Sequence, residues 1–145
     1  LEALKQTADR KDSPNNVYGW GLVNALNASL YYGMIISNKP ELTETGDNQS
    51  VSINVLSNNT VVQESVKMFY SLNGGEFTAR EMVLTEKSGD NNSGKYTAII
   101  PFDLRTENVK FYFSASDDKD TRTVPYLAPQ KFFFFDPETK KLEIY

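Results

Sequence analysis

The sequence predicts a mainly β protein, an antiparallel β-sandwich of about seven strands preceded by two short α-helices. The chain contains nine Phe and eight Tyr, and both residue types favour strands. From about residue 51 onward, apolar and polar residues alternate with the period of two that a half-buried strand shows. Turn-forming residues separate these segments at short intervals, as in a sandwich. Hydrophobic residues make up 39% of the 145 residues, which is enough for the packed core of one ordinary domain.

Residues 1 to about 38 are predicted to be helical. Apolar residues recur at helical spacing in 1–8, and the polar run 9–16 should end this first helix. A second helix should begin near Asn24, because Asn is a favoured N-cap residue. Gly33 should interrupt or end it.

The segment 41–46 is polar and predicts a linker or loop that leads into the β region. We therefore expect three parts. Residues 1–40 form the helical part, 41–46 the linker, and 47–145 the sandwich.

The β region divides into segments that end at turn signals. Asn73-Gly74-Gly75 is a strong hairpin signal, because these residues accept positive φ angles. A last hairpin is expected around residues 136–140. The predicted strands cover residues 51–55, 66–72, 76–84, 95–100, 109–115, 131–135 and 142–145, with a short edge piece at 121–125.

Two absences limit the chemistry of this chain. It has no His, so a Ser-His-Asp or Cys-His arrangement cannot be built within it, and it has no Cys, which removes thiolate nucleophiles and Cys metal sites. We therefore predict no catalytic, cofactor-binding or metal-binding residue and no cofactor. The net charge of −4 argues against a nucleic-acid partner, which requires Lys and Arg against phosphate.

The sequence offers no segment for a membrane span or a leader. No apolar run approaches the roughly 20 residues that cross a bilayer. Residues 1–5 mix charged and apolar groups, unlike a signal peptide. Since the chain also lacks an initiator Met, we expect it to be a piece of a longer protein.

The helical part contains a pattern that resembles the carboxyl-terminal end of the catalytic domain of subtilisin-like serine proteases (subtilases, peptidase family S8). In that family a helix ending in L-x-x-T-A is followed by a loop and then by G-x-G-x-[VI]-N-A-x-x-A. The residues that match are Leu4, Thr7, Ala8, Gly19, Gly21, Val23, Asn24, Ala25 and Ala28.

This resemblance implies a secreted or cell-surface parent protein that is a serine endopeptidase. The Asp, His and Ser of the family's triad lie earlier in the chain, and its Gly-Thr-Ser-(Met/Leu)-(Ala/Ser) motif does not occur here. The fragment would then be non-catalytic, and its first partner would be the upstream protease domain of the same chain. Asn24 and the two glycines of the pattern are structural positions in the family.

Three blocks in the β region resemble immunoglobulin-like and fibronectin type III-like domains of bacteria. The first block contains Y-S-x-N-G-G-x-[WF], the second G-x-Y-x-A-x-I-P, and the third V-x-[FY]-[YF]-x-x-A-x-D. They match residues 67–77, 94–101 and 109–117 in the same order. The resemblance implies an immunoglobulin-like sandwich, an architecture that serves many functions.

Three features could be binding sites or plain structure. Asp117, Asp118 and Asp120 could begin a calcium site, since calcium takes several oxygen ligands, or form a solvated turn, which we favour because the EF-hand spacing is absent. Residues 132–135 are four consecutive Phe, which could form a platform for a sugar or a peptide. We favour a strand covered on both faces, with one pair in the core and the other facing outward or packing on the N-terminal helices. Trp20 could hold a ligand, although packing is the more common role.

Three functions remain open from these residues. The sandwich could brace or space a protease domain, or help to present a polypeptide substrate to it. It could be a carbohydrate-binding or adhesion module that recognises a surface glycan. It could also be a passive spacer in a surface protein.

Overall fold

The computed structural model describes residues 1–17, 19–37, 39–45, 48–104 and 107–145. Tyr18, which precedes Gly19 of the subtilase-like pattern, lies outside the described residues. So do residue 38, where the helical prediction ends, and residues 46 and 47, where the linker was predicted to meet the sandwich.

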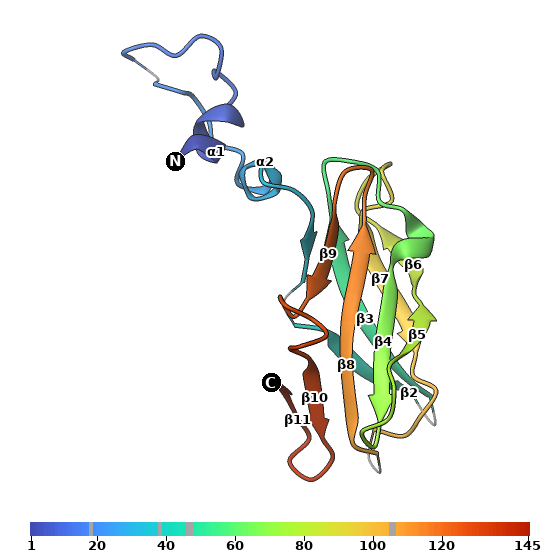
Figure 1. Cartoon of the computed structure of the whole chain (residues 1–145). Coiled ribbons are helices and arrows are strands. Elements are labelled where there is room, and N and C mark those ends of the chain that lie inside the picture. Colours follow the sequence, from blue (N-terminus) through green and yellow to red (C-terminus); the bar gives the residue numbers. More distant parts are fainter. Residues whose placement is uncertain (18, 38, 46–47, 105–106) are drawn as a thin grey trace.

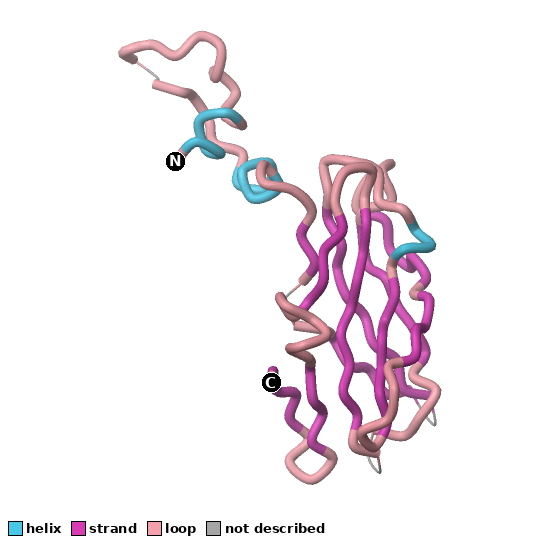
Figure 2. The backbone as a smooth tube through the Cα atoms, viewed as in Figure 1, coloured by secondary structure: helices cyan, strands magenta, loops and turns pink. Residues whose placement is uncertain are grey.

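The structure confirms the mainly β prediction, with two antiparallel sheets that pack face to face (Figures 1 and 2). The five-stranded sheet has the order β1-β3-β7-β6, and β2 also pairs with β3. Its strands are β1 (Ile35–Ile36), β2 (Glu41–Thr45), β3 (Asn48–Leu56), β6 (Val83–Lys87) and β7 (Gly94–Ile99). The six-stranded sheet has the order β11-β10-β8-β4-β5, and β9 also pairs with β8. Its strands are β4 (Lys67–Leu72), β5 (Thr78–Glu81), β8 (Val109–Ser116), β9 (Thr121–Val124), β10 (Phe133–Asp136) and β11 (Lys141–Ile144).

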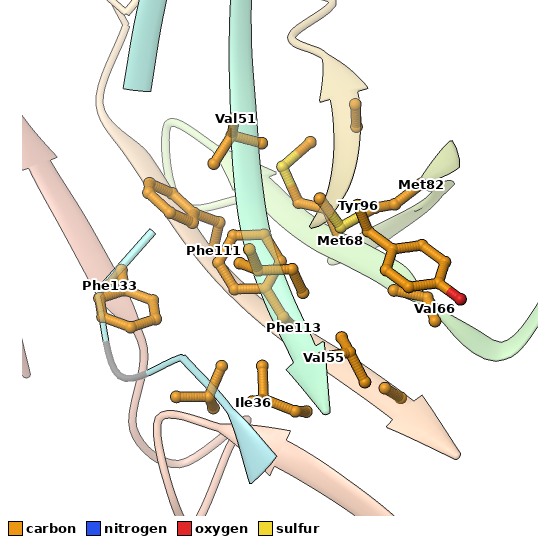
Figure 3. Packing of buried hydrophobic residues seen from close by; sticks show 14 of the residues in the cluster. Ile36, Val51, Val55, Val66, Met68, Met82, Tyr96, Phe111, Phe113 and Phe133 are labelled. Atoms are coloured by element: carbon orange, nitrogen blue, oxygen red, sulfur yellow. The ribbon is translucent and has the colours of Figure 1, made fainter. Parts of the chain in front are cut away.

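The hydrophobic core lies between the two sheets and follows from the alternation in the sequence. On β8 every second residue is buried, and the intervening residues are partly exposed. Figure 3 shows Phe111 and Phe113 of this strand among Val51 and Val55 of β3. The ring of Tyr96 is also buried, and its hydroxyl donates to the Asn92 carbonyl at 2.7 Å. The polar group of this core residue therefore keeps a hydrogen-bond partner.

The predicted strand 76–84 is two strands in two different sheets. β5 pairs with β4, whereas β6 pairs with β7. Met82 lies between them, is buried, and donates its N–H to the Val66 carbonyl at 3.0 Å. The chain therefore changes sheet at a residue that enters the core. This is one reason why the described part of the chain has eleven strands where about seven were predicted.

The segment predicted as a linker forms strand β2, which corrects the expectation of a loop at 41–45. Its backbone pairs with β3 in a register that places Leu42 opposite Val51. Leu42 packs against the core, while its neighbours on the strand are exposed. An edge strand needs backbone pairing more than apolar side chains, so polar composition alone did not reveal it. Ile35–Ile36, in the part predicted as helical, likewise forms strand β1 against β3. The division into a protease remnant and an accessory domain stays a prediction.

Two short helices precede the sandwich, as predicted. They are α1 (Glu2–Gln6) and α2 (Ala25–Leu30), and a 3-10 turn, η1 (Gln63–Ser65), lies before β4. Asn24 caps α2 by accepting the Asn27 N–H at 2.9 Å, which confirms the predicted start of this helix. Figures 1 and 2 show both helices projecting away from the sandwich, beyond the end of β1.

Candidate functional site

The described residues of 1–32, here called the N-terminal extension, expose more apolar side chains than they bury. Leu22 is 79% exposed, Leu26 55% and Tyr32 69%. The buried apolar residues of this extension are Ala3, Ala8 and Leu30. A segment that exposes several large apolar side chains is a candidate for contact with another protein surface. The extension is therefore the first candidate for a functional surface.

The loop of the extension is held in shape by its own backbone and by Asp9. The Asp9 carboxylate accepts the Leu22 N–H at 2.7 Å, and the Asp9 N–H donates to the Leu22 carbonyl at 3.2 Å. Gly21 has a φ of +81°, and a Cβ at this position would collide with the Asp9 carboxylate. This close approach explains why the position requires glycine.

Trp20 lies in the same loop and is 38% exposed. The ammonium of Lys5 sits 5.3 Å from the centre of its ring. Cation–π contacts of this type stabilise an aromatic ring at a surface. The ring thus contacts Lys5 within the extension and keeps part of its surface exposed.

The extension is joined to the sandwich through the carboxyl end of α2. Arg122 of β9 donates from Nη2 to the Tyr32 carbonyl at 2.6 Å and from Nε to the Asp120 carboxylate at 2.9 Å. Asn58 donates to the Leu30 carbonyl at 3.4 Å. A positive side chain suits the negative end of a helix, and both donors bind backbone carbonyls at or just beyond the end of α2.

Gly33 allows the chain to pass close to Arg122 at this junction. It has a φ of +117°, and a Cβ there would lie 2.7 Å from Nη2 of Arg122. Beside the junction, β1 and β9 border an open groove of about 680 Å³ that includes Tyr126. Sequence reasoning missed Arg122 and Asn58, because their partners are backbone carbonyls and no side-chain pattern indicates them.

The acidic residues considered for calcium are not gathered around one point. Asp117 is buried, with 7% of its surface exposed, whereas Asp118 and Asp120 are exposed. Both oxygens of Asp117 accept protein hydrogen bonds, at 2.6 Å from the Ser57 hydroxyl and 2.8 Å from the Asp120 N–H. Within the described ranges, no group of three or more acidic side chains is placed to hold a metal ion.

The environment of Asp117 lowers its pKa. Burial by itself would raise the pKa, but hydrogen bonds from Ser57, from the backbone N–H groups of Lys119 and Asp120, and from Asn59 outweigh it and bring the pKa from 3.8 to about 2. The carboxylate therefore stays charged and organises the loop between β8 and β9.

The four consecutive Phe residues alternate between the two faces of their sheet. Phe133 is buried and Phe135 packs against the core, while Phe132 and Phe134 are partly exposed on the outer face. The Phe132 ring stacks on Tyr145 at 6.4 Å and carries the Lys110 ammonium 4.8 Å from its centre. The outer pair is thus covered by β8 and by the end of the chain, and not by the N-terminal helices.

A second aromatic cluster lies on the outer face of the same sheet. Phe69 and Tyr112 stack at 4.7 Å with an angle of 3° between their planes, and Phe77 meets Tyr112 edge-on at 5.1 Å. The faces of Phe69 and Tyr112 therefore cover each other, and Phe77 closes the cluster from the side. This arrangement favours packing over a flat platform for a sugar ring.

Part of this chain is similar in sequence to part of a known protein. No protein-family model matches the chain. It is 30% identical over 124 residues to Bacillopeptidase F of Bacillus subtilis (strain 168). The match covers 73% of this chain and 8% of that protein, so the chain corresponds to a small part of it. Because 73% exceeds the share that residues 47–145 make up, the match also includes some residues before residue 47.

The chain is also similar to two solved structures of carbohydrate-binding modules. The β-1,3-glucan binding domain of carbohydrate-binding module family 56 has a TM-score of 0.43 and 11% identity, covering 77% of this chain and 98% of that one. A bromine derivative of BhCBM56 has a TM-score of 0.40 and 12% identity, covering 73% and 87%.

The described helices are too short or too polar to cross a bilayer. The chain as a whole has no His and no Cys, so the exposed Ser and Tyr side chains have no imidazole or thiolate beside them. Of the features above, the N-terminal extension, with its exposed apolar side chains, is the strongest candidate for an interaction surface.

Proposed function

We propose that this chain is the non-catalytic carboxyl-terminal region of a secreted or cell-surface serine endopeptidase. The N-terminal extension packs on the catalytic domain that precedes it in the same protein. The sandwich braces or spaces that domain. The observation that carries this proposal is the set of exposed apolar side chains on the extension.

Two further observations support the proposal. The related region of Bacillopeptidase F belongs to a protein whose name marks it as a peptidase. Arg122 and Asn58 tie the end of α2 to the sandwich, so a catalytic domain bound to the extension would hold a defined orientation relative to the sandwich. This is the arrangement that a brace requires.

The carbohydrate-binding alternative has less support from the geometry. The aromatic rings on the outer sheet face cover one another, and Phe132 is also covered by Lys110. A sugar ring binds best to an open aromatic face. A bracing function therefore has more support than carbohydrate binding.

The test uses the complete parent protein. Its coding region before Leu1 should contain a Gly-Thr-Ser-(Met/Leu)-(Ala/Ser) motif, with His and Asp motifs earlier. Replacing Leu22 and Leu26 together with Ser should shorten the half-life of peptidase activity at elevated temperature severalfold, because each loses apolar contact worth about 1.5–3 kcal/mol with the catalytic domain. Val83→Ser is the matched control, since Val83 is 67% exposed on β6, far from the extension.

Two outcomes would contradict the proposal. One is a parent sequence without the serine motif. The other is a Leu22 and Leu26 double variant whose activity is as long-lived as that of the Val83 control.

A further inference from the structure

Strand β11 is the outermost strand of its sheet, and within the described structure one of its backbone edges is unpaired (Figure 1). Phe132 and Tyr145 exchange two backbone hydrogen bonds, of 3.1 and 3.0 Å, at the end of the β10–β11 ladder. Hydrogen-bonded pairs alternate along an antiparallel ladder. The register then points the N–H and C=O groups of Leu142 and Ile144 away from β10. These groups are free to pair with a further extended strand.

A groove of about 410 Å³ with apolar and charged lining residues runs beside this edge, between the β10–β11 hairpin and the start of β2. Its apolar lining consists of Pro40, Leu42, Phe135 and Leu142. Leu42, Phe135 and Leu142 pack against the core yet keep part of their surface exposed. Every second side chain of a strand added to β11 would face this groove.

The rim of the groove carries an excess of positive charge. Lys39, Lys140 and Lys141 line it, all three are exposed, and none has an ion pair with another described residue. The acidic member of the rim, Glu143, accepts the Tyr145 hydroxyl at 2.8 Å. This local charge is opposite in sign to the net charge of −4 of the whole chain. The rim therefore favours a ligand that carries carboxylates.

We propose that β11 and this groove bind an extended polypeptide segment in which acidic side chains alternate with apolar ones. The unpaired backbone edge selects a polypeptide, because its amide groups can continue the ladder. The three lysines select acidic side chains, and the apolar lining takes up the side chains between them. Figure 1 shows the β10–β11 hairpin pointing away from the N-terminal extension, so this ligand and a domain bound to the extension can be present together.

The experiment measures binding of a capped, fluorescein-labelled peptide that alternates Glu and Val, by fluorescence anisotropy with the full chain. Binding should weaken as salt rises, because the lysines are exposed to solvent. The double variant Lys39→Glu and Lys141→Glu should bind at least about tenfold more weakly, since two attractive pairs become repulsive. Lys87→Glu on β6, at the far edge of the other sheet, is the matched control and should bind as the unaltered chain does.

A second arm alters the ligand and leaves the protein unchanged. The same peptide with N-methyl groups on alternate amides keeps its charges and side chains but cannot donate to β11. Its binding should fall at least about tenfold, the equivalent of one lost hydrogen bond.

Three results would overturn the proposal. They are no measurable binding of the peptide, equal binding of the N-methylated peptide, and equal binding of an acidic oligosaccharide such as an oligogalacturonate. Circular dichroism and urea unfolding test whether the lysine variants are folded. If they are not, the comparison of the N-methylated and unmodified peptides on the unaltered chain tests the proposal.

Discussion

Replacing Asp117 with Asn should destabilise the sandwich, because the carboxylate joins two loops that are far apart in the sequence. Its oxygens accept hydrogen bonds from Ser57, Asn59 and the backbone of its own turn. The substitution places an NH₂ group against one or more of these donors. A buried donor that loses its acceptor costs about 1–3 kcal/mol.

The lowered pKa gives a second measure of the same contribution. A fall from 3.8 to about 2 corresponds to stabilisation on the order of 2 kcal/mol. Because the folded-state pKa is the lower one, this stabilisation is present above about pH 4 and is lost as the pH falls to about 2. The difference between unaltered and variant protein should therefore shrink across that interval.

The assay is urea unfolding followed by circular dichroism at neutral and acid pH. Asp118→Asn is the matched control, because Asp118 is an exposed neighbour on the same turn. At neutral pH, Asp117→Asn should lower the free energy of unfolding by about 2 kcal/mol, and the control should change it by less than about 0.5 kcal/mol. Equal stability of Asp117→Asn and the unaltered chain would refute the reasoning. Calcium that stabilises the unaltered chain, but not Asp117→Asn, would show that the carboxylate serves a metal instead.

Three further predictions concern the core and the junction. Phe113→Ala should cost about 3–5 kcal/mol in urea unfolding, because the ring is fully buried between Phe111 and Phe133, whereas the exposed Tyr126→Ala should cost little. Gly33→Ala should speed proteolytic release of the N-terminal extension and leave unfolding of the sandwich unchanged, because the strain falls on the junction with Arg122; equal cleavage rates would contradict this. Asn24→Ala should reduce the helical signal of α2 in circular dichroism, with a loss of about 1 kcal/mol for the missing cap, and a preserved signal would show that packing alone holds the helix.

Much of the sandwich could be predicted because its pattern is local. The alternation on β3 and β8 follows from residues two apart, and the structure buries the side chains that the pattern selects. Asn73 and Gly74 adopt φ angles of 50° and 80°, as the hairpin signal requires. The start of α2 follows from one side chain and an N–H three residues later.

Features that depend on pairing between distant segments could not be predicted. Strand β2 exists because its backbone meets β3, although its composition is that of a loop. The change of sheet at Met82 depends on which strands stand on either side of it.

The sequence by itself determined that this chain has strands with one buried face, two short helices before them, and neither His nor Cys for catalysis. Only the tertiary structure decided what surrounds Asp117, which carbonyl Arg122 holds, and which groove lies beside the free edge of β11. The physical reason is that the hydrophobic period of a segment and the secondary-structure propensity of its residues depend on a few neighbouring positions. Hydrogen bonds between residues 60 or 90 positions apart arise only when the register of the sheets brings those residues together.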